Sequence, residues 1–296
     1  MNIFGQDVKI DGMAVRVARL DGDKYNFPVS PEATISALRD CGTRVDLFTF
    51  LQPLPETAVK YSYPVEWDNL AVLPISTFDN WWNNQIRSYP RNRARQAEKR
   101  GVVLREVPFG PELLEGIRGI YNESPVRQGK KFPHYGMSPE RIRDYANTFL
   151  DRSIYVGAFL GETMIGFIKL VMDETRTQAC LVHILSMIQH KDKAPTNALI
   201  AQAVKVCAER NVSFLIYEHF SYGKKQGDSL SHFKEVNGFA RVDIPRYYVP
   251  LTSLGRLAFR LGLHHRFADL LPESFTGKLR DLRKTWYSHR FQSVES

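Results

Sequence analysis

Residues 177–239 read TQACLVHILSMIQHKDKAPTNALIAQAVKVCAERNVSFLIYEHFSYGKKQGDSLSHFKEVNGF. Apolar runs and a helical repeat predict a strand, a turn, a helix, a second strand and, after a polar loop, a short helix. The first strand is predicted at 178–189, the turn at 190–195, the helix at 196–210, the second strand at 212–220 and the short helix at 228–236. A strand that leads through a turn into a helix directs backbone N–H groups at one spot, and such a spot binds anions. We therefore expect the chain to be organised around an anion site at this turn.

Working outward, the stretch is preceded by an antiparallel meander. Strands at 154–160 and 164–172 are joined by Gly161-Glu162, which is a hairpin signal. Upstream of them we predict a strand at 102–107, a helix at 111–121, a long loop at 122–136 and another helix at 139–150. Downstream we predict a tyrosine-rich strand at 241–251. Loops as long as 122–136 are usually functional or disordered when they lie inside a compact domain. The mix of aromatic and cationic residues in this loop favours a functional one.

The N-terminal part, residues 1–75, alternates only weakly between apolar and polar residues. It contains predicted strands at 15–20, 45–51 and 70–75, and a helix at 31–40 with Ser30 as its cap. No catalytic motif stands out there.

The composition is that of a globular protein of 296 residues, with 43% apolar and 24% charged residues. No apolar run approaches the roughly 18 residues that a membrane-spanning helix needs. The N-terminus lacks a basic start and an apolar core, so we expect no signal peptide.

The three cysteines, Cys41, Cys180 and Cys207, are scattered along the chain. This usage favours a reducing compartment, and hence a cytoplasmic location, over a disulfide framework or a zinc knuckle. Cys180 and Cys207 lie in apolar segments, so we expect buried thiols. No metal-ligand spacing is visible, and we expect no metal.

The formal net charge is +8, which favours phosphate-bearing partners. Basic residues gather in a predicted helix at 91–100 and in a tail from Arg256 to Arg290. The helix either binds a nucleic acid backbone or is a solvated charged face. The tail carries apolar residues at helical spacing, so it either lies on an anionic membrane face or packs on the domain.

This order of elements resembles the GNAT-type N-acyltransferases. In that family the turn after the fourth strand holds the pyrophosphate of acyl-CoA with the pattern Gln/Arg-x-x-Gly-x-Gly/Ala. The matching stretch here is His190-Lys-Asp-Lys-Ala-Pro-Thr-Asn-Ala198, in which the small Ala194 and the helix start fit and the glycines are absent. The family's helix followed by Gly-Phe is present at Phe233 to Phe239.

A closer resemblance is to the Fem-type peptidyltransferases, which share that fold in two tandem domains. Their tryptophan-containing helix runs into a basic helix that ends Lys-x-Gly-Val, and here Trp81-Trp82 precede a basic helix ending Lys99-Arg100-Gly101-Val102. The resemblance implies an α/β (α+β) fold with a mixed, mostly antiparallel sheet flanked by helices. We divide the chain into an N-terminal subdomain at 1–98, a GNAT-like domain at 99–252 and a basic helical tail at 253–296.

Acyl transfer to an amine needs a base, a polarised carbonyl and an acid for the leaving group. In this fold a backbone N–H where two parallel strands splay holds the carbonyl, here near residues 185–188. The candidate catalytic residues are His183, Glu123, His134 and Tyr222, the last in place of the family's tyrosine acid, since Phe233 stands at the matching position. Each also has an ordinary structural alternative: a satisfied histidine, a solvated helix end or a loop tyrosine.

For the donor, lysines near the turn and in the following loop suit a diphosphate. The candidate cofactor-binding residues are Lys191, Lys193, Thr196, Asn197, Ala198, Lys224 and Lys225. For the acceptor we expect Arg127, because guanidinium binds carboxylate or phosphate in a bidentate way, together with Lys131 and Tyr135.

These residues lead to an acyltransferase hypothesis. We expect acyl-CoA as donor, direct attack by an amine, and an amino sugar or a cell-envelope or polysaccharide precursor as acceptor. The alternatives are a Fem-type transfer from aminoacyl-tRNA and a non-catalytic GNAT-like binding module.

Overall fold

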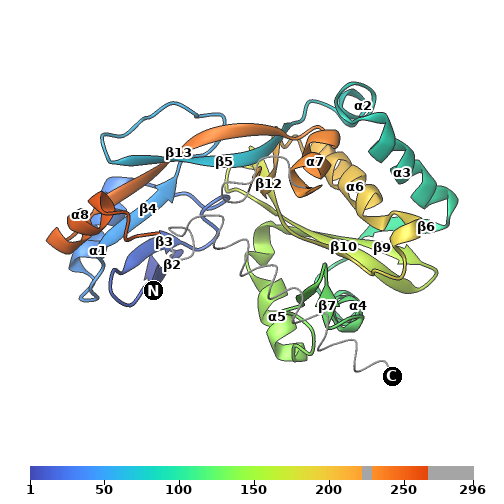
Figure 1. The fold of residues 1–296 in the computed structure, drawn as a ribbon, viewed down its shortest axis with the longest axis horizontal. Helices are drawn as coiled ribbons and strands as arrows, with labels where there is room; N and C mark the ends of the chain where they lie inside the picture. The colour runs from blue at the N-terminus through green and yellow to red at the C-terminus, as the bar shows by residue number, and fades with distance from the viewer. Residues whose placement is uncertain (222–228, 266–296) are drawn as a thin grey trace.

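The structure, a computed structural model, describes residues 1–221 and 229–265. Its framework is an 11-stranded sheet in the order β1-β2-β3-β4-β13-β5-β12-β11-β10-β9-β6 (Figure 1). The strands are β1 (Asn2–Ile3), β2 (Gln6–Asp11), β3 (Val17–Leu20), β4 (Leu47–Leu51), β5 (Val65–Pro74), β6 (Val102–Glu106), β9 (Ser153–Leu160), β10 (Thr163–Met172), β11 (Gln178–Ser186), β12 (Phe214–His219) and β13 (Ala240–Pro250). A separate hairpin is formed by β7 (Val126–Arg127) and β8 (Lys130–Lys131).

Only two strand pairs of the large sheet are parallel, β3 with β4 and β11 with β12. The predicted mixed, mostly antiparallel sheet is thereby confirmed. The long strand β13 joins the two halves of the sheet, because residues 240–247 pair with β5 and residues 246–250 pair with β4.

Helices cover both faces of the C-terminal half (Figure 1). The helices of the described residues are α1 (Pro31–Asp40), α2 (Phe78–Asn80), α3 (Ser88–Lys99), α4 (Pro111–Asn122), α5 (Pro139–Asn147), α6 (Pro195–Glu209), α7 (Ser229–Val236) and α8 (Ser253–Arg260), of which α1 and α8 lie on the N-terminal half. Helix α6 packs on β9, β10 and β11 with α3 against it, and α4 packs on β10 with α5 beside it. Among the described residues, no helix is both long and apolar enough to cross a membrane.

Local signals explain why three helices begin where the sequence predicts. Ser30, Ser138 and Thr252 each place a hydroxyl so that it accepts a backbone N–H of the first turn. In α1 and α5 a proline follows the cap, where its missing N–H costs nothing.

The core has a main cluster in the C-terminal half, where Phe167 and Leu199 are almost fully buried. A second cluster in the N-terminal half contains Phe48 and Tyr247. A third cluster contains Leu70 and Ile216, so the described residues form three apolar clusters on one sheet.

Some predicted boundaries differ from the structure. Strands β1 and β2 were not predicted, because they are short and polar. The tryptophan-containing helix that the Fem-type resemblance implies at Trp81-Trp82 consists of α2 and a π-helical turn at Trp81–Gln85. There Trp81 is fully buried, and its Nε1 donates to Asn237 O (2.9 Å). The basic helix predicted at 91–100 begins at Ser88 and packs on α6. The domain division stays a prediction; one sheet runs across residue 98, and beyond α8 the tail from residue 266 lies outside the described residues.

Candidate active site

The parallel strands β11 and β12 separate part-way along their length. They pair only at Gln178–Cys180 with Phe214–Ile216, yet β11 continues to Ser186 and β12 to His219. A turn then leads from β11 to α6, with Ala194 in the left-handed conformation (φ 55°) directly before Pro195. The predicted splay and the predicted turn-to-helix junction therefore lie at the same end of β11.

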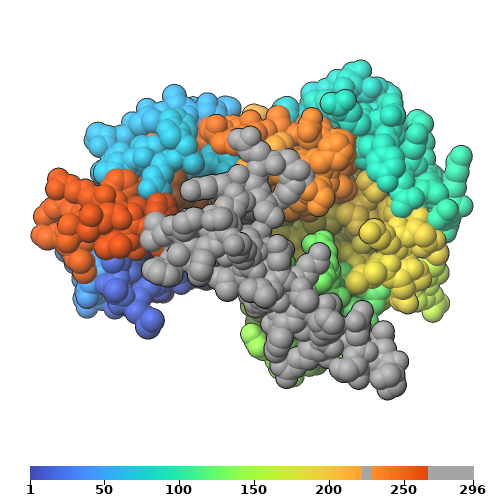
Figure 2. All heavy atoms as spheres, viewed as in Figure 1, coloured from blue at the N-terminus to red at the C-terminus, as the bar shows by residue number. Residues whose placement is uncertain are grey.

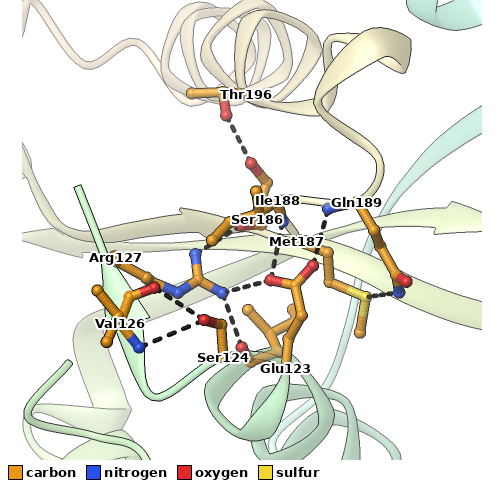
Figure 3. Close-up of polar contacts among 10 residues, drawn as sticks. Glu123, Ser124, Val126, Arg127, Ser186, Met187, Ile188, Gln189 and Thr196 are labelled. Carbon is orange, nitrogen blue, oxygen red and sulfur yellow. Dashed lines mark hydrogen bonds and ion pairs between the residues drawn. The ribbon is translucent and has the colours of Figure 1, made fainter. Parts of the chain in front are cut away.

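A carboxylate occupies the backbone donors at the end of β11. Glu123, directly after α4, accepts the N–H of Ile188 through Oε2 and that of Gln189 through Oε1, both at 2.8 Å. Its Oε2 also accepts from Arg127 (2.9 Å), and Figure 3 shows both side chains converging on the strand end. The carboxylate therefore ties the end of α4 to the segment after β11 through two hydrogen bonds and to Arg127 through a third.

Arg127 completes this connection. Its guanidinium donates to the carbonyls of Ser186 (2.8 Å) and Ile120 (2.9 Å), and its plane lies over Phe132. Burial lowers the pKa of Arg127, and the charge of Glu123 opposes that shift. In the described part of the chain its Nε has no hydrogen-bond partner.

The hydroxyls of Ser186 and Thr196 lie 2.8 Å apart (Figure 3). Ser186 is the last residue of β11, and Thr196 belongs to the first turn of α6. A continuous polar path therefore runs from Glu123 and Arg127 through Ser186 to the start of α6.

A cavity of about 370 Å³ lies between the sheet and helices α4 and α5. Its wall is mostly aromatic and apolar, with two histidines and one lysine. The lining residues are Ile117, Tyr121, His134, Ile142, Tyr145, Ala146, Thr148, Tyr155, Phe167, Lys169, Val182 and His183. Val182 and His183 lie on the part of β11 that no longer pairs with β12, so the cavity adjoins the splay.

Two histidines and a tyrosine form the polar part of this cavity. Nδ1 of His183 lies 3.4 Å from the hydroxyl of Tyr121, whose ring stacks on His134 at 4.7 Å. The two imidazole centroids are 5.5 Å apart. These contacts bring the predicted candidates His134 and His183 together.

Burial controls the protonation of the cluster. Burial, with smaller contributions from His134 and Lys169, lowers the pKa of His183 to about 4. Burial also lowers the pKa of His134 and raises that of Tyr121. Both imidazoles are therefore neutral at pH 7, and Nδ1 of His134 has no partner among the described residues.

Lys169 lies at the inner end of the cavity and is 3% exposed. Its Nζ donates to the carbonyls of Ala146 (2.9 Å) and Thr148 (2.6 Å) and to the Thr148 hydroxyl (2.8 Å). Burial lowers its pKa to about 8. The ammonium group thus satisfies carbonyls at the C-terminal end of α5, which fixes that helix against β10.

The predicted donor residues lie together at the turn and the start of α6. Lys191 is exposed, Lys193 is half-buried beside Asp192, and Thr196 and Asn197 are half-buried, whereas Ala198 is buried. The basic helix α3 holds this turn, because Arg93 donates to Lys191 O (3.0 Å) and Arg100 to Asp192 O (2.7 Å).

Other predicted residues lie apart from the histidine cluster or outside the described chain. Lys131 and Tyr135 are exposed on the loop that carries His134. Tyr222, Lys224 and Lys225 lie outside the described residues.

The sequence analysis missed Tyr121, Lys169 and Ser186. Tyr121 shares the helical spacing of Leu113 and Ile117, so it reads as a core residue. Lys169 interrupts the apolar strand β10, where eight of its neighbours are buried, and a lone lysine in such a strand is a signal that could have been used.

No protein family and no curated protein matches the sequence. Solved structures are similar in fold. FemX aligns with a TM-score of 0.57 at 10% identity, covering 86% of this chain and 84% of that chain. L-PGS from Bacillus licheniformis aligns with a TM-score of 0.56 at 14% identity, covering 86% and 84%. The C-terminal domain of a protein named lysylphosphatidylglycerol synthetase from Agrobacterium fabrum gives 0.52 at 14% identity, covering 86% and 83%. These likenesses confirm the predicted fold, which the chain shares with FemX and L-PGS along most of its length.

Proposed function

We propose that this protein is an N-acyltransferase that moves an acyl group from acyl-CoA to an amine by direct attack. The observation that carries the proposal is the position of the neutral His134–His183 pair, in a cavity beside the splay of β11 and β12. Fold likeness to FemX and L-PGS supports a transferase as well.

In the proposed reaction the amine nitrogen attacks the thioester carbonyl carbon. The C–N bond forms, the C–S bond breaks, and the leaving thiolate takes up a proton. The proton released by the amine passes to an imidazole of the His134–His183 pair, both neutral at pH 7, and from that imidazolium to the leaving thiolate. The lowered pKa favours the second transfer, because it makes the imidazolium a stronger acid.

The carbonyl needs a backbone donor near residues 185–188. Ile188 N–H donates to Glu123, and Met187 N–H donates to Ile165 O (2.8 Å). Backbone N–H groups alternate in direction along a strand, so that of Leu185 faces β10, as does that of Met187. Ser186, whose N–H faces away from β10, is therefore our candidate for this donor.

We assign Glu123 a positioning role in place of the predicted role as base. Its carboxylate accepts three hydrogen bonds at the end of β11, and protonation would weaken all three. Arg127 is likewise engaged, so we propose that it holds the strand end, and its predicted contact with the acceptor stays a prediction.

A second candidate donor is aminoacyl-tRNA. It is favoured by the fold likeness to FemX and L-PGS and by Arg95 and Lys99, which project from α3 into solvent. An acceptor such as an amino sugar or a cell-envelope or polysaccharide precursor rests on the family resemblance alone. Peripheral contact of the tail with an anionic membrane also stays a prediction; on α8, Leu254 and Leu257 are exposed.

Titration calorimetry with CoA and acetyl-CoA, at low and moderate salt, tests the donor. Lys191→Ala should weaken CoA binding, while the double variant Arg95→Ala/Lys99→Ala should leave it unchanged. Arg93 is unsuitable for this comparison, because its loss would also free the turn at Lys191.

Charged tRNA is the competing ligand. If the protein binds tRNA instead of CoA, affinity should fall steeply with salt and with the Arg95→Ala/Lys99→Ala change. If neither CoA nor charged tRNA binds, the acyltransferase proposal fails and a non-catalytic binding module becomes the better interpretation.

A further inference from the structure

Three potential metal ligands meet at the end of the molecule opposite the histidine cavity. Glu66 lies on β5, and His264 and His265 follow α8, which Figure 2 shows on the surface. Nε2 of His264 lies 2.9 Å and Nε2 of His265 3.1 Å from the same oxygen, Oε1 of Glu66. The three ligand atoms all lie within 4.8 Å of one another.

The spacing fits a small divalent ion. Zinc bonds to imidazole nitrogen and carboxylate oxygen measure about 2.0 to 2.2 Å, so two ligand atoms on a tetrahedral ion lie about 3.3 Å apart. The observed separations of 2.9 and 3.1 Å are therefore a few tenths of an ångström too short for a bound ion. Small side-chain rotations would open the space.

The surroundings of the three residues fix His264 in place and leave Glu66 and His265 partly exposed to solvent. The side chain of His264 is only 1% exposed and packs against Phe259 (5.0 Å, stacked) and Tyr248 (4.7 Å). The side chains of Glu66 and His265 are 32% and 37% exposed. Solvent can therefore reach the space between the ligands and supply a fourth one.

The hydrogen bonds of His264 are compatible with a metal. Nδ1 of His264 has no partner in the described part of the chain. Moving the imidazole proton from Nε2 to Nδ1 therefore breaks no other hydrogen bond and frees Nε2 to coordinate.

We propose that Glu66, His264 and His265 bind one divalent transition-metal ion of the zinc type, with solvent completing the coordination. Two imidazoles and one carboxylate favour such an ion over magnesium or calcium, which prefer oxygen ligands. The ion connects the segment after α8 to β5, so it stabilises the N-terminal half of the sheet. This site is independent of the acyltransferase proposal.

The experiment is a calorimetric titration of the chelator-treated full-length protein with Zn²⁺. The expected result is one saturable site of micromolar or tighter affinity, which Glu66→Gln and His265→Ala each weaken by at least about 10-fold. His232→Ala is the matched control, since His232 is an exposed histidine on α7 and should leave binding unchanged. His264 is left intact because its burial makes an unfolded variant a risk.

Thermal unfolding supplies a second measurement. Saturating Zn²⁺ should raise the melting temperature of the parent protein and of His232→Ala, but not that of His265→Ala. The proposal is overturned if the parent protein shows no saturable binding at submillimolar Zn²⁺. It is equally overturned if Glu66→Gln and His265→Ala bind as tightly as the parent.

Discussion

The carboxylate of Glu123 forms an ion pair with the guanidinium of Arg127, four residues further along the chain, at 2.9 Å. Both side chains are nearly enclosed, at 11% and 12% exposure. Since Glu123 also accepts two backbone N–H groups and Arg127 donates to two carbonyls, the pair fixes the loop after α4 to the end of β11.

Replacing Glu123 with glutamine should lower the free energy of unfolding by about 2 to 4 kcal/mol, because it leaves an enclosed guanidinium without its counter-charge. Urea unfolding measures this, and hydrogen exchange should quicken at the amides of Ile188 and Gln189. The control is Glu115→Gln, which breaks an exposed pair with Arg118 and should cost at most about 1 kcal/mol. Equal losses for the two variants would contradict the positioning role.

Arg246 on β13 joins the two halves of the molecule. Its Nε donates to Asp68 and its NH1 to Asp23, each at 2.8 Å, and its side chain is 11% exposed. Arg246→Met should destabilise the fold by about 3 to 5 kcal/mol, because two carboxylates stay enclosed without a partner.

The same strand provides the control for Arg246. Arg241 forms an exposed pair with Asp243, so Arg241→Met should change the free energy of unfolding by at most about 1 kcal/mol. Chemical denaturation of both variants measures the two losses in free energy of unfolding. If Arg246→Met loses no more than Arg241→Met, water reaches the two aspartates and the prediction is wrong.

His183 should make stability depend on pH. Its pKa is lowered from 6.5 to about 4 in the fold, so between these values the unfolded chain binds a proton that the folded chain does not. The contribution is complete above pH 6.5 and is lost as the pH falls toward 4, by about 1.4 kcal/mol per unit. Urea unfolding of the parent and of His183→Phe at pH 7.5 and 5 measures it: the parent should lose more stability than the variant over this interval. Parallel pH profiles would mean that His183 titrates normally.

Gly255 allows α8 to contact the sheet closely. A Cβ at this position would lie 1.9 Å from the carbonyl oxygen of Asp46. Gly255→Ala should therefore destabilise the protein by about 1 to 3 kcal/mol.

The control for Gly255 lies on α4. A Cβ at Gly119 would meet only Met187 at 3.8 Å, so Gly119→Ala should stabilise the helix by up to about 1 kcal/mol. Thermal unfolding of both alanine variants should show a lower melting temperature for Gly255→Ala and a higher one for Gly119→Ala. A higher melting temperature for Gly255→Ala would show that α8 can move away from the sheet at little cost.

Much of the fold could be predicted from local sequence. Two helix starts are marked by a serine followed by a proline, Ser30 with Pro31 and Ser138 with Pro139. The turn at Gly161 (φ 59°) marks the hairpin between β9 and β10. These signals act over a few residues, so no long-range knowledge is needed to interpret them.

The candidate site was predictable only in part. The turn before α6 was found, because a strand, a turn and a helix follow one another in the chain. The contact of Glu123 with Ile188 joins positions 65 residues apart, and no periodicity records it.

The sequence by itself determined the order of elements, their caps and their apolar faces, because these follow from backbone sterics and from burial at a regular spacing. Only the tertiary structure decided which polar groups meet. It brought His134 beside His183 and placed Glu66 against His264, 198 residues away. The physical reason is that hydrogen bonds and ion pairs form between whichever groups the packed core brings within about 3 Å, and sequence distance does not enter that condition.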